Sequence, residues 1–114
     1  MDPTSAIMIT KALDGLWARS LATAQNVANA NSPGYRPVRV SFEEALQSAA
    51  RQGPEALRNV TAKIAQAPTG SAGTEMRLDL ELATASETGM RYAALLDLLG
   101  RQLQISHTVV RGGQ

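Results

Sequence analysis

The last third of the chain carries an apolar pattern that restricts the possible folds more than any other feature. From Asp79 to about Val110 the residues have helical spacing, with two apolar stripes on one helix. Together the stripes cover roughly half of the circumference, more than the ~100° stripe of an ordinary surface helix. Such a helix needs two neighbours, and the second is either the middle of the chain or another subunit. One stripe holds Tyr92, Leu96, Leu99, Leu103 and Val110, the other holds Leu98, Ile105 and Val109, and Leu95 lies between them.

The first thirty residues supply one of these neighbours. Asp2 followed by Pro3 is typical of a helix start, with Ser5 as an alternative cap. The apolar spacing then predicts one amphipathic helix from Pro3 to about Ala30, in which Gly15 costs about 1 kcal/mol relative to alanine. Its apolar series consists of Ile9, Leu13, Leu16, Trp17, Leu21, Ala24, Val27 and Ala28.

The stretch NVANANSPGYR, residues 26–36, predicts the end of this helix. Asn29 or Asn31 can adopt the left-handed conformation at a helix end, and asparagine amides can bind carbonyl groups that the helix leaves open. Pro33 and Gly34 are the usual central pair of a type II turn, because glycine supplies the positive φ. Taken locally, the stretch is a helix stop followed by a tight turn.

The residues after the turn predict a short extended run and a short helix. Apolar and polar side chains alternate after Pro37, which confines any strand there to the edge of a sheet. Ser41 and Glu44 match a capping box, so we expect a helix over about residues 42–52 that ends at Gly53.

The region from Glu55 to Glu75 has no clear periodicity. Residues 59–66, NVTAKIAQ, are compatible with a short strand, and a Gly/Ser/Pro-rich loop follows. We expect the whole region to be mobile. The fold class we expect is mainly α, with long end helices that pair as an antiparallel hairpin or coiled coil beside a small irregular or β-containing middle. The expected segments are an N-terminal helix (1–31), a turn and extended segment (32–41), a variable middle region (42–78) and a C-terminal helix with a flexible tail (79–114).

Composition excludes several classes of protein. The chain has 114 residues, the size of one domain, and a net charge of +1 with the charges spread along it, which argues against a nucleic-acid partner. It has no cysteine, so disulfides and thiolate metal sites are excluded.

The start lacks the features of a secretory signal, and no apolar stretch approaches the roughly 20 residues of a membrane span. We therefore expect a cytoplasmic protein, not integral to a membrane, unless it is exported by a route without such a signal.

Few residues suggest catalysis. His107 is the only histidine, and a histidine near a helix C-terminus more often stabilises the helix dipole. Asp79 and Glu81 resemble a carboxylate pair, but acidic residues at a helix start more often stabilise the helix dipole. The phosphate-loop, zinc-protease and serine-hydrolase motifs are absent. We predict a protein that is not an enzyme and needs no cofactor or metal.

NVANANSPGYR also resembles the N-terminal signature of the bacterial flagellar rod, hook and hook-associated protein family. That signature reads N-[LIV]-A-N-x-x-T-P-G-[YF] followed by a basic residue, and Ser32 replaces the usual threonine here. RPVRVSFEEAL and the closing ETGMRYAALLDLLGRQLQISHTVVRGG resemble short rod subunits of the family, whereas the family's start to the last helix is only partly kept, at residues 78–81. The motif residues carried over are Asn26, Ala28, Asn29, Ser32, Pro33, Gly34, Tyr35 and Arg36.

The resemblance implies a structural subunit that polymerises into the basal-body rod. Such subunits are exported from the cytoplasm through the flagellar type III apparatus without a cleaved signal and assemble in the periplasm. The implied partners are other rod subunits, the rod-to-ring junction and the export apparatus, with self-association by helical symmetry. Free subunits of this family often have disordered ends that become ordered on assembly. The alternative is a stand-alone helical interaction module or a small homodimer.

For the motif and the two helices, we expect structural roles. Asn26 and Asn29 are expected to bind the backbone of the turn, so that the first helix can pair with the last. The residues expected to pack or assemble are Ile9, Leu13, Leu16, Trp17, Leu21, Val27, Tyr92, Leu95, Leu96, Leu98, Leu99, Leu103, Ile105 and Val109.

Overall fold

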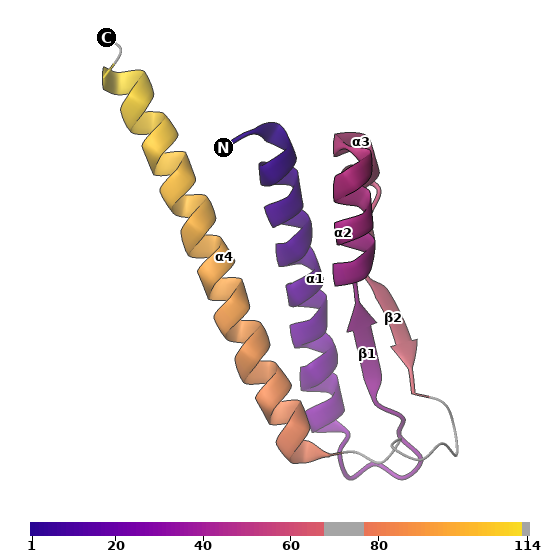
Figure 1. The fold of residues 1–114 in the computed structure, drawn as a ribbon. Coiled ribbons are helices and arrows are strands. Elements are labelled where there is room, and N and C mark those ends of the chain that lie inside the picture. The colour runs from indigo at the N-terminus through magenta and orange to yellow at the C-terminus, as the bar shows by residue number, and fades with distance from the viewer. Residues whose placement is uncertain (68–76, 113–114) are drawn as a thin grey trace.

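Two long antiparallel helices dominate the molecule, as the sequence predicts. The computed structural model describes residues 1–67 and 77–112, and most of the predicted Gly/Ser/Pro-rich loop and the last two residues lie outside these ranges. α1 (Pro3–Ala28) and α4 (Leu78–Gly112) lie side by side and diverge toward the start of α1 (Figure 1). The remaining elements are β1 (Val38–Ser41), α2 (Glu43–Gln52), α3 (Pro54–Arg58) and β2 (Lys63–Gln66).

The start of α1 is capped as predicted. The Asp2 carboxylate accepts a hydrogen bond from the backbone N–H of Ser5 at 2.6 Å, and Pro3 is the first helical residue. This bond lowers the pKa of Asp2 below its usual value. Ser5, the alternative cap, therefore lies inside the first turn.

The end of α1 differs from the prediction. Asn29 is the C-terminal cap, but its φ of −105° is not left-handed. Within the described residues, positive φ values occur only at Gly34 and Gly53, so the prediction of a left-handed asparagine is wrong. Asn29 instead donates from its side-chain amide to the carbonyl of Gln25 at 2.9 Å, and the same carbonyl accepts the backbone N–H of Asn29 at 3.1 Å.

The tight turn after α1 is confirmed. The backbone N–H of Tyr35 donates to the carbonyl of Ser32 at 3.2 Å, across Pro33 and Gly34. Gly34 has a φ of 73°, as the third position of a type II turn requires.

The extended run forms one strand of a small antiparallel sheet. β1 pairs with β2, in a register that places Val40 opposite Ile64 and Ser41 opposite Lys63. Val40 is buried whereas its neighbours Arg39 and Ser41 are exposed, so the predicted alternation and the predicted strand within residues 59–66 are both confirmed.

Three helix boundaries need correction, and one short helix is additional to the prediction. Because Ser41 still belongs to β1, the predicted capping box is wrong: Phe42 is the cap of α2, without a side-chain cap bond. α2 ends at Gly53 as predicted, but the five-residue helix α3 follows at once. α4 begins at Leu78, so Asp79 lies in its first turn and is not its cap. Gly112, predicted to belong to the tail, is still helical.

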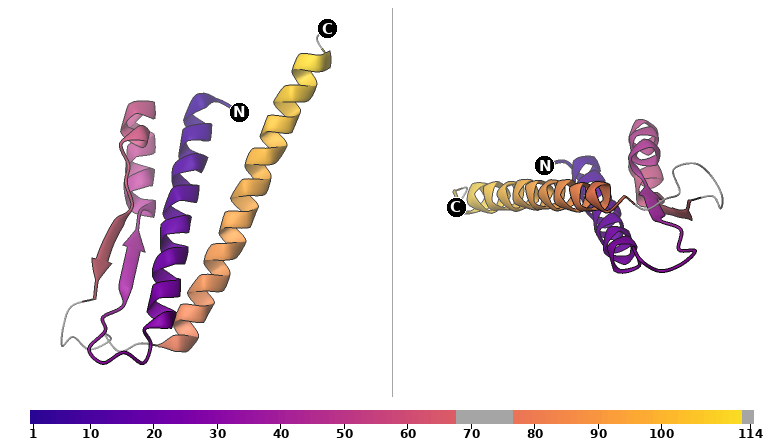
Figure 2. Two further views of the ribbon diagram at one scale, coloured as in Figure 1. Left: turned by 180° about the vertical axis from the view of Figure 1, so that it is seen from behind. Right: turned by 90° about the horizontal axis from the view of Figure 1, so that it is seen from below.

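The molecule is a flat, open layer. Figure 2 shows α1 between α4 on one side and the sheet with α2 and α3 on the other. The extents are 64 × 27 × 14 Å, and the radius of gyration is 17.7 Å, against about 13 Å for a compact chain of this length. The accessible surface of 7777 Å² exceeds the roughly 6,000 Å² typical of this mass. The main core consists of Leu16, Ala22, Val40, Phe42, Leu46, Ala49 and Leu57.

The middle of the chain does not cover the second stripe of α4. α2 and α4 flank α1 from different sides, and the side chains of Leu98 and Ile105 are 43% and 55% exposed. The alternative in which the middle region supplies the second neighbour is therefore wrong for these two residues, while the side chain of Val109 lies outside the described residues.

Candidate functional site

Asn26 is the centre of a buried polar cluster at the end of α1. Its side-chain nitrogen donates to the carbonyl of Val38 at 2.9 Å and to the carboxylate of Glu81 at 3.1 Å. Its side-chain oxygen accepts from the N–H of Val38 and from the Tyr35 hydroxyl, both at 2.8 Å. The amide of this fully buried residue thus uses both donors and both acceptor positions. One side chain therefore connects α1, the turn, β1 and α4.

Glu81 brings the last helix to this cluster. Its side chain is 2% exposed, and its second oxygen accepts from the guanidinium of Arg39 at 2.5 Å. A buried carboxylate is costly unless it is paired and hydrogen-bonded, and Glu81 satisfies both conditions. We call Asn26, Tyr35, Val38, Arg39 and Glu81 the Asn26 junction. It fixes the start of α4 against the end of α1 and the side of β1.

The other motif residues shape the turn around the junction. The Ser32 hydroxyl donates to the side-chain oxygen of Asn29 at 3.2 Å, and Arg36 donates to the side chain of Gln66 in β2 at 2.8 Å. The expectation that Asn26 and Asn29 bind the turn's backbone is wrong in detail, because Asn26 binds the strand and Asn29 binds the helix end. Ala28, Pro33 and Gly34 are exposed, and Tyr35 and Arg36 are half-buried.

Gly15 has a packing role that the sequence does not reveal. A β-carbon built on Gly15 would lie 2.4 Å from the ring of Phe42. Real β-carbons do not approach a ring so closely, so only glycine allows the buried Phe42 ring to lie against α1. The helical cost of this glycine is offset by the contact between α1 and the segment that joins β1 to α2.

Arg19 anchors the start of α2 to α1. Its guanidinium donates to both carboxylate oxygens of Glu43, at 2.6 and 2.8 Å, and to the carbonyl of Val40 at 2.7 Å. It also lies 4.9 Å from the centre of the Phe42 ring, where a cation is attracted to the ring face. The hydrogen bonds from Arg19 are the main reason that the pKa of Glu43 falls to about 2. The same pairing raises the pKa of Arg19.

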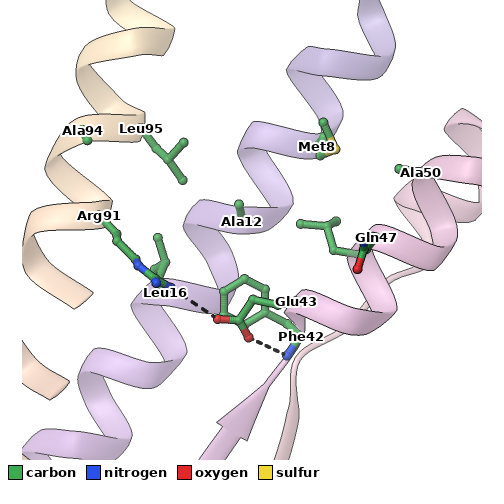
Figure 3. A pocket seen from close by; sticks show the side chains of 11 residues that line it. Met8, Ala12, Leu16, Phe42, Glu43, Gln47, Ala50, Arg91, Ala94 and Leu95 are labelled. Carbon is green, nitrogen blue, oxygen red and sulfur yellow. Dashed lines mark hydrogen bonds and ion pairs between the residues drawn. The ribbon is translucent and has the colours of Figure 1, made fainter. Parts of the chain in front are cut away.

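An apolar groove runs over α1 between α2 and α4. Figure 3 shows Leu95 reaching in from α4, with Leu16 and Phe42 at the bottom. The groove has a volume of about 500 Å³, and charged side chains meet only near one end of it, where Arg91 and Glu43 are 3.8 Å apart. The groove is open along the surface and its lining is almost entirely apolar, which suits an apolar helix face better than a polar small molecule. The other lining residues are Met8, Ala12, Leu46, Gln47, Ala50 and Ala94.

The predicted packing residues fall into three groups. Ile9, Leu13 and Leu16 are buried within the chain, and Val27, Tyr92, Leu95 and Leu99 are half-buried. The third group is at least 43% exposed although its members lie on the predicted stripes, and it consists of Trp17, Leu21, Leu96, Leu98, Leu103 and Ile105. Trp17 still contacts the other long helix, because its ring centre lies 6.2 Å from that of Tyr92.

The acidic residues considered for catalysis do not converge. Glu81 belongs to the junction, whereas Asp79 binds Arg77 at 3.0 Å and 3.3 Å, which lowers the pKa of Asp79. The side chain of His107 lies outside the described residues. Among the side chains that the structure describes, no three His, Cys, Asp or Glu residues are grouped to hold a metal ion. None of the helices in residues 1–67 and 77–112 is long and apolar enough to cross a membrane.

No protein-family model matches the chain, and no curated protein matches its sequence.

Proposed function

We propose that this protein is a structural subunit of the bacterial flagellar basal-body rod, of the proximal rod type. The subunit polymerises with other rod subunits, and the rod transmits torque from the motor ring to the hook. The observation that carries the proposal is the Asn26 junction. The stretch that resembles the family signature supplies its central amide and Tyr35, and these hold the last helix to the first. A terminal helix pair of fixed geometry is what a polymerising rod subunit needs.

The uncovered apolar surface supports the same proposal. Leu96, Leu98, Leu103 and Ile105 project from α4 with at least 43% of each side chain exposed, and exposed apolar side chains grouped on one helix are typical of a surface that another molecule covers. The apolar groove between α2 and α4 also suits an apolar helix face. In the rod, helices of neighbouring subunits would cover both surfaces through heterologous contacts that do not close on themselves.

The proposal assigns this protein no catalytic residue, no cofactor and no metal. Its partners are other rod subunits, the rod-to-ring junction and the export apparatus, and its location is the periplasmic rod after export without a cleaved signal. The alternative is a stand-alone helical interaction module, which would never enter a basal body.

The test is complementation of a deletion strain in the bacterium that encodes the chain. The wild-type gene should restore swimming and complete rods in purified basal bodies, whereas Leu98→Glu and Ile105→Glu should each block rod assembly with little effect on expression and export. Leu99→Glu should be more severe, because it places a charge at a half-buried position of the main stripe, and full burial of a large apolar side chain contributes roughly 1.5–3 kcal/mol. Ser86→Glu, at an exposed polar position of α4, is the matched control and should complement normally.

Two outcomes would contradict the proposal. One is a deletion strain that swims and has complete basal bodies. The other is full motility with Leu98→Glu and Ile105→Glu combined, which would show that this face of α4 has no role in assembly.

A further inference from the structure

One face of α4 is uncovered along most of the helix. It combines two alanines with a methionine, a leucine and an isoleucine at helical spacing, and every one of these side chains is exposed. The exposed fractions of Met90, Leu98 and Ile105 are 68%, 43% and 55%. From its first to its last apolar residue the face is about 33 Å long. Its apolar members are Ala83, Met90, Ala94, Leu98 and Ile105.

Four charged residues lie on or at the edges of this face, arranged antisymmetrically about Ala94, with Glu87 and Arg101 in line with Ala94 itself. Glu87 lies seven positions before Ala94 and Arg101 seven positions after it, while Arg91 and Asp97 lie three positions before and after. Each position therefore has a residue of opposite charge at the same distance on the other side. When two copies of a helix lie antiparallel and centred on Ala94, Glu87 comes opposite Arg101 of the partner, while Arg91 and the partner's Asp97 reach the same height on opposite flanks of the contact.

The apolar residues have the same relation. Met90 and Leu98 lie four positions on either side of Ala94, and Ala83 and Ile105 lie eleven positions away. An antiparallel pair would place a small side chain opposite a larger one at its ends and two alanines at its centre, where the helices can approach closely. A parallel pair in register would instead place Glu87 opposite Glu87 and Arg101 opposite Arg101.

We propose that a second copy of this chain docks on α4, antiparallel and centred on Ala94, as a closed two-fold homodimer. Within one copy, Arg91 binds Glu87 at 2.8 Å and Arg101 binds Asp97 at 3.0 Å. In the dimer, Glu87 of one copy comes next to Arg101 of the partner, so the two intrahelical pairs join into one row of alternating charges. The same row forms at both ends of the contact because the interface is isologous.

This inference concerns the free chain and does not rest on a role in the rod. It does have a consequence for that role, because Arg91 and Ala94 belong both to the paired face and to the edge of the groove. A paired subunit cannot receive a neighbour along that edge. The dimer is therefore a form that must separate before an open polymer can grow.

Cysteine cross-linking of the full-length chain tests the centre of the contact. The chain has no cysteine of its own, so Ala94→Cys introduces a unique thiol at an exposed alanine of α4. In the proposed dimer the thiols of the two copies face each other and should form a disulfide on mild oxidation. Ala85→Cys is the matched control at another exposed alanine of α4, and in the dimer its two thiols would be about 27 Å apart along the helix axis. Circular dichroism checks that both variants remain helical.

Charge reversal tests the orientation independently. Sedimentation velocity over a concentration series should show a monomer–dimer equilibrium for the wild type. Glu87→Arg and Arg101→Glu should each weaken dimerisation by roughly tenfold, since an exposed ion pair is worth little alone but each change acts at both ends of the interface. The double variant should return to within about threefold of the wild type, although it retains the intrahelical repulsion of both single variants.

The results separate the proposal from its competitors. A parallel arrangement staggered by four residues would place Glu87 beside Arg91 and Asp97 beside Arg101 of the next copy, so there the double variant would be worse than either single one. That result, a disulfide in the Ala85→Cys variant without one in the Ala94→Cys variant, or a chain that stays monomeric at every concentration would each overturn the proposal. None of these measurements involves motility, so the dimer and the proposed rod function can fail separately.

Discussion

Asn26 and Glu81 lie 55 positions apart in the sequence and share a buried hydrogen bond of 3.1 Å. This bond links the only two long helices of the described structure at the one place where a charged side chain of α4 is buried. Both partners are otherwise satisfied, Asn26 by β1 and the turn, and Glu81 by Arg39. The docking of α4 is thus coupled to the correct folding of the turn and the strand.

Replacing Asn26 by alanine should destabilise the protein strongly. The change removes the hydrogen-bond partner of the Val38 N–H group, of the Val38 C=O group and of one Glu81 oxygen. Because these groups are shielded from water, we expect the free energy of unfolding to fall by about 3 kcal/mol. Urea denaturation followed by circular dichroism measures it. Asn31→Ala, at an exposed asparagine five residues later, should change stability by no more than about 0.5 kcal/mol. Similar losses for the two variants would disprove the central role of Asn26.

Replacing Glu81 by glutamine should weaken the docking of α4 in particular. The neutral side chain keeps its size but loses the ion pair with Arg39, and we expect a loss of about 1–3 kcal/mol, less than for a fully buried pair because Arg39 is 58% exposed. Trp17 is the only tryptophan and packs near Tyr92 of α4, so its fluorescence reports helix separation. Under mild denaturant, Glu81→Gln should shift the emission to the red before helix content falls.

A double-mutant cycle with Arg39→Gln isolates the ion pair of the junction. The two single losses should add up to more than the loss in the double variant, because either change alone already breaks the same contact. Strict additivity would mean that Arg39 does not stabilise Glu81.

Replacing Gly15 by alanine should destabilise the protein although alanine favours helices. The new β-carbon would displace the Phe42 ring, and overpacking of this kind costs about 1–3 kcal/mol. Gly89→Ala in α4 is the control, because nothing lies within 4 Å of its added carbon, and there we expect a gain of up to about 1 kcal/mol. Thermal unfolding of both variants gives the comparison, and a gain at both positions would contradict the packing role of Gly15.

The ion pair between Arg19 and Glu43 should make stability depend on pH in the acidic range. Arg19 lowers the pKa of Glu43 from 4.5 in the unfolded chain to about 2, so the stabilisation is complete above about pH 5 and is lost as the pH falls toward 2. Half of the Glu43 side chain is exposed, so solvent screening reduces the effect to about 1 kcal/mol.

Glu43→Gln measures this contribution directly. In urea titrations the variant should be less stable than the wild type at pH 7 by about 1 kcal/mol and should match it near pH 2. Asp2 and Asp79 also have lowered pKa values, but they titrate equally in both proteins and cancel in the difference. A difference that stays constant from pH 7 to pH 2 would contradict the assignment.

The sequence predicts those features whose causes are local. The cap at Asp2, the turn at Pro33 and Gly34, and the two long helices all depend on residues that are near one another in the chain. The five-residue helix α3 is missed because it is too short to have a periodicity. The roles of Gly15 and Glu81 are missed because their partners, Phe42 and Asn26, are distant in the sequence.

Exposure is the other feature that the pattern of a single chain does not reveal. An apolar stripe indicates that a helix face avoids water but does not say what covers it. Leu96 and Leu99 lie on the same predicted stripe, yet only Leu99 is half-buried, because it follows the half-buried Leu95 by four positions and so lies on the same side of α4. Of the eight motif residues, Asn26 alone is fully buried, and the amino-acid type does not distinguish it from Asn29.

The one-sided attachment of α4 gives the molecule the mechanics of a lever. Its buried polar anchor at Glu81 lies near one end, and the remaining helix extends about 46 Å from it to Gly112. With a pivot at that end, a tilt of about 5° moves the far end by about 4 Å, the scale of a helix turn. A small change in the hydrogen bonds of Asn26 would therefore produce its largest displacement at the far end of α4, beyond the contacts that Tyr92 and Leu95 make with the rest of the chain.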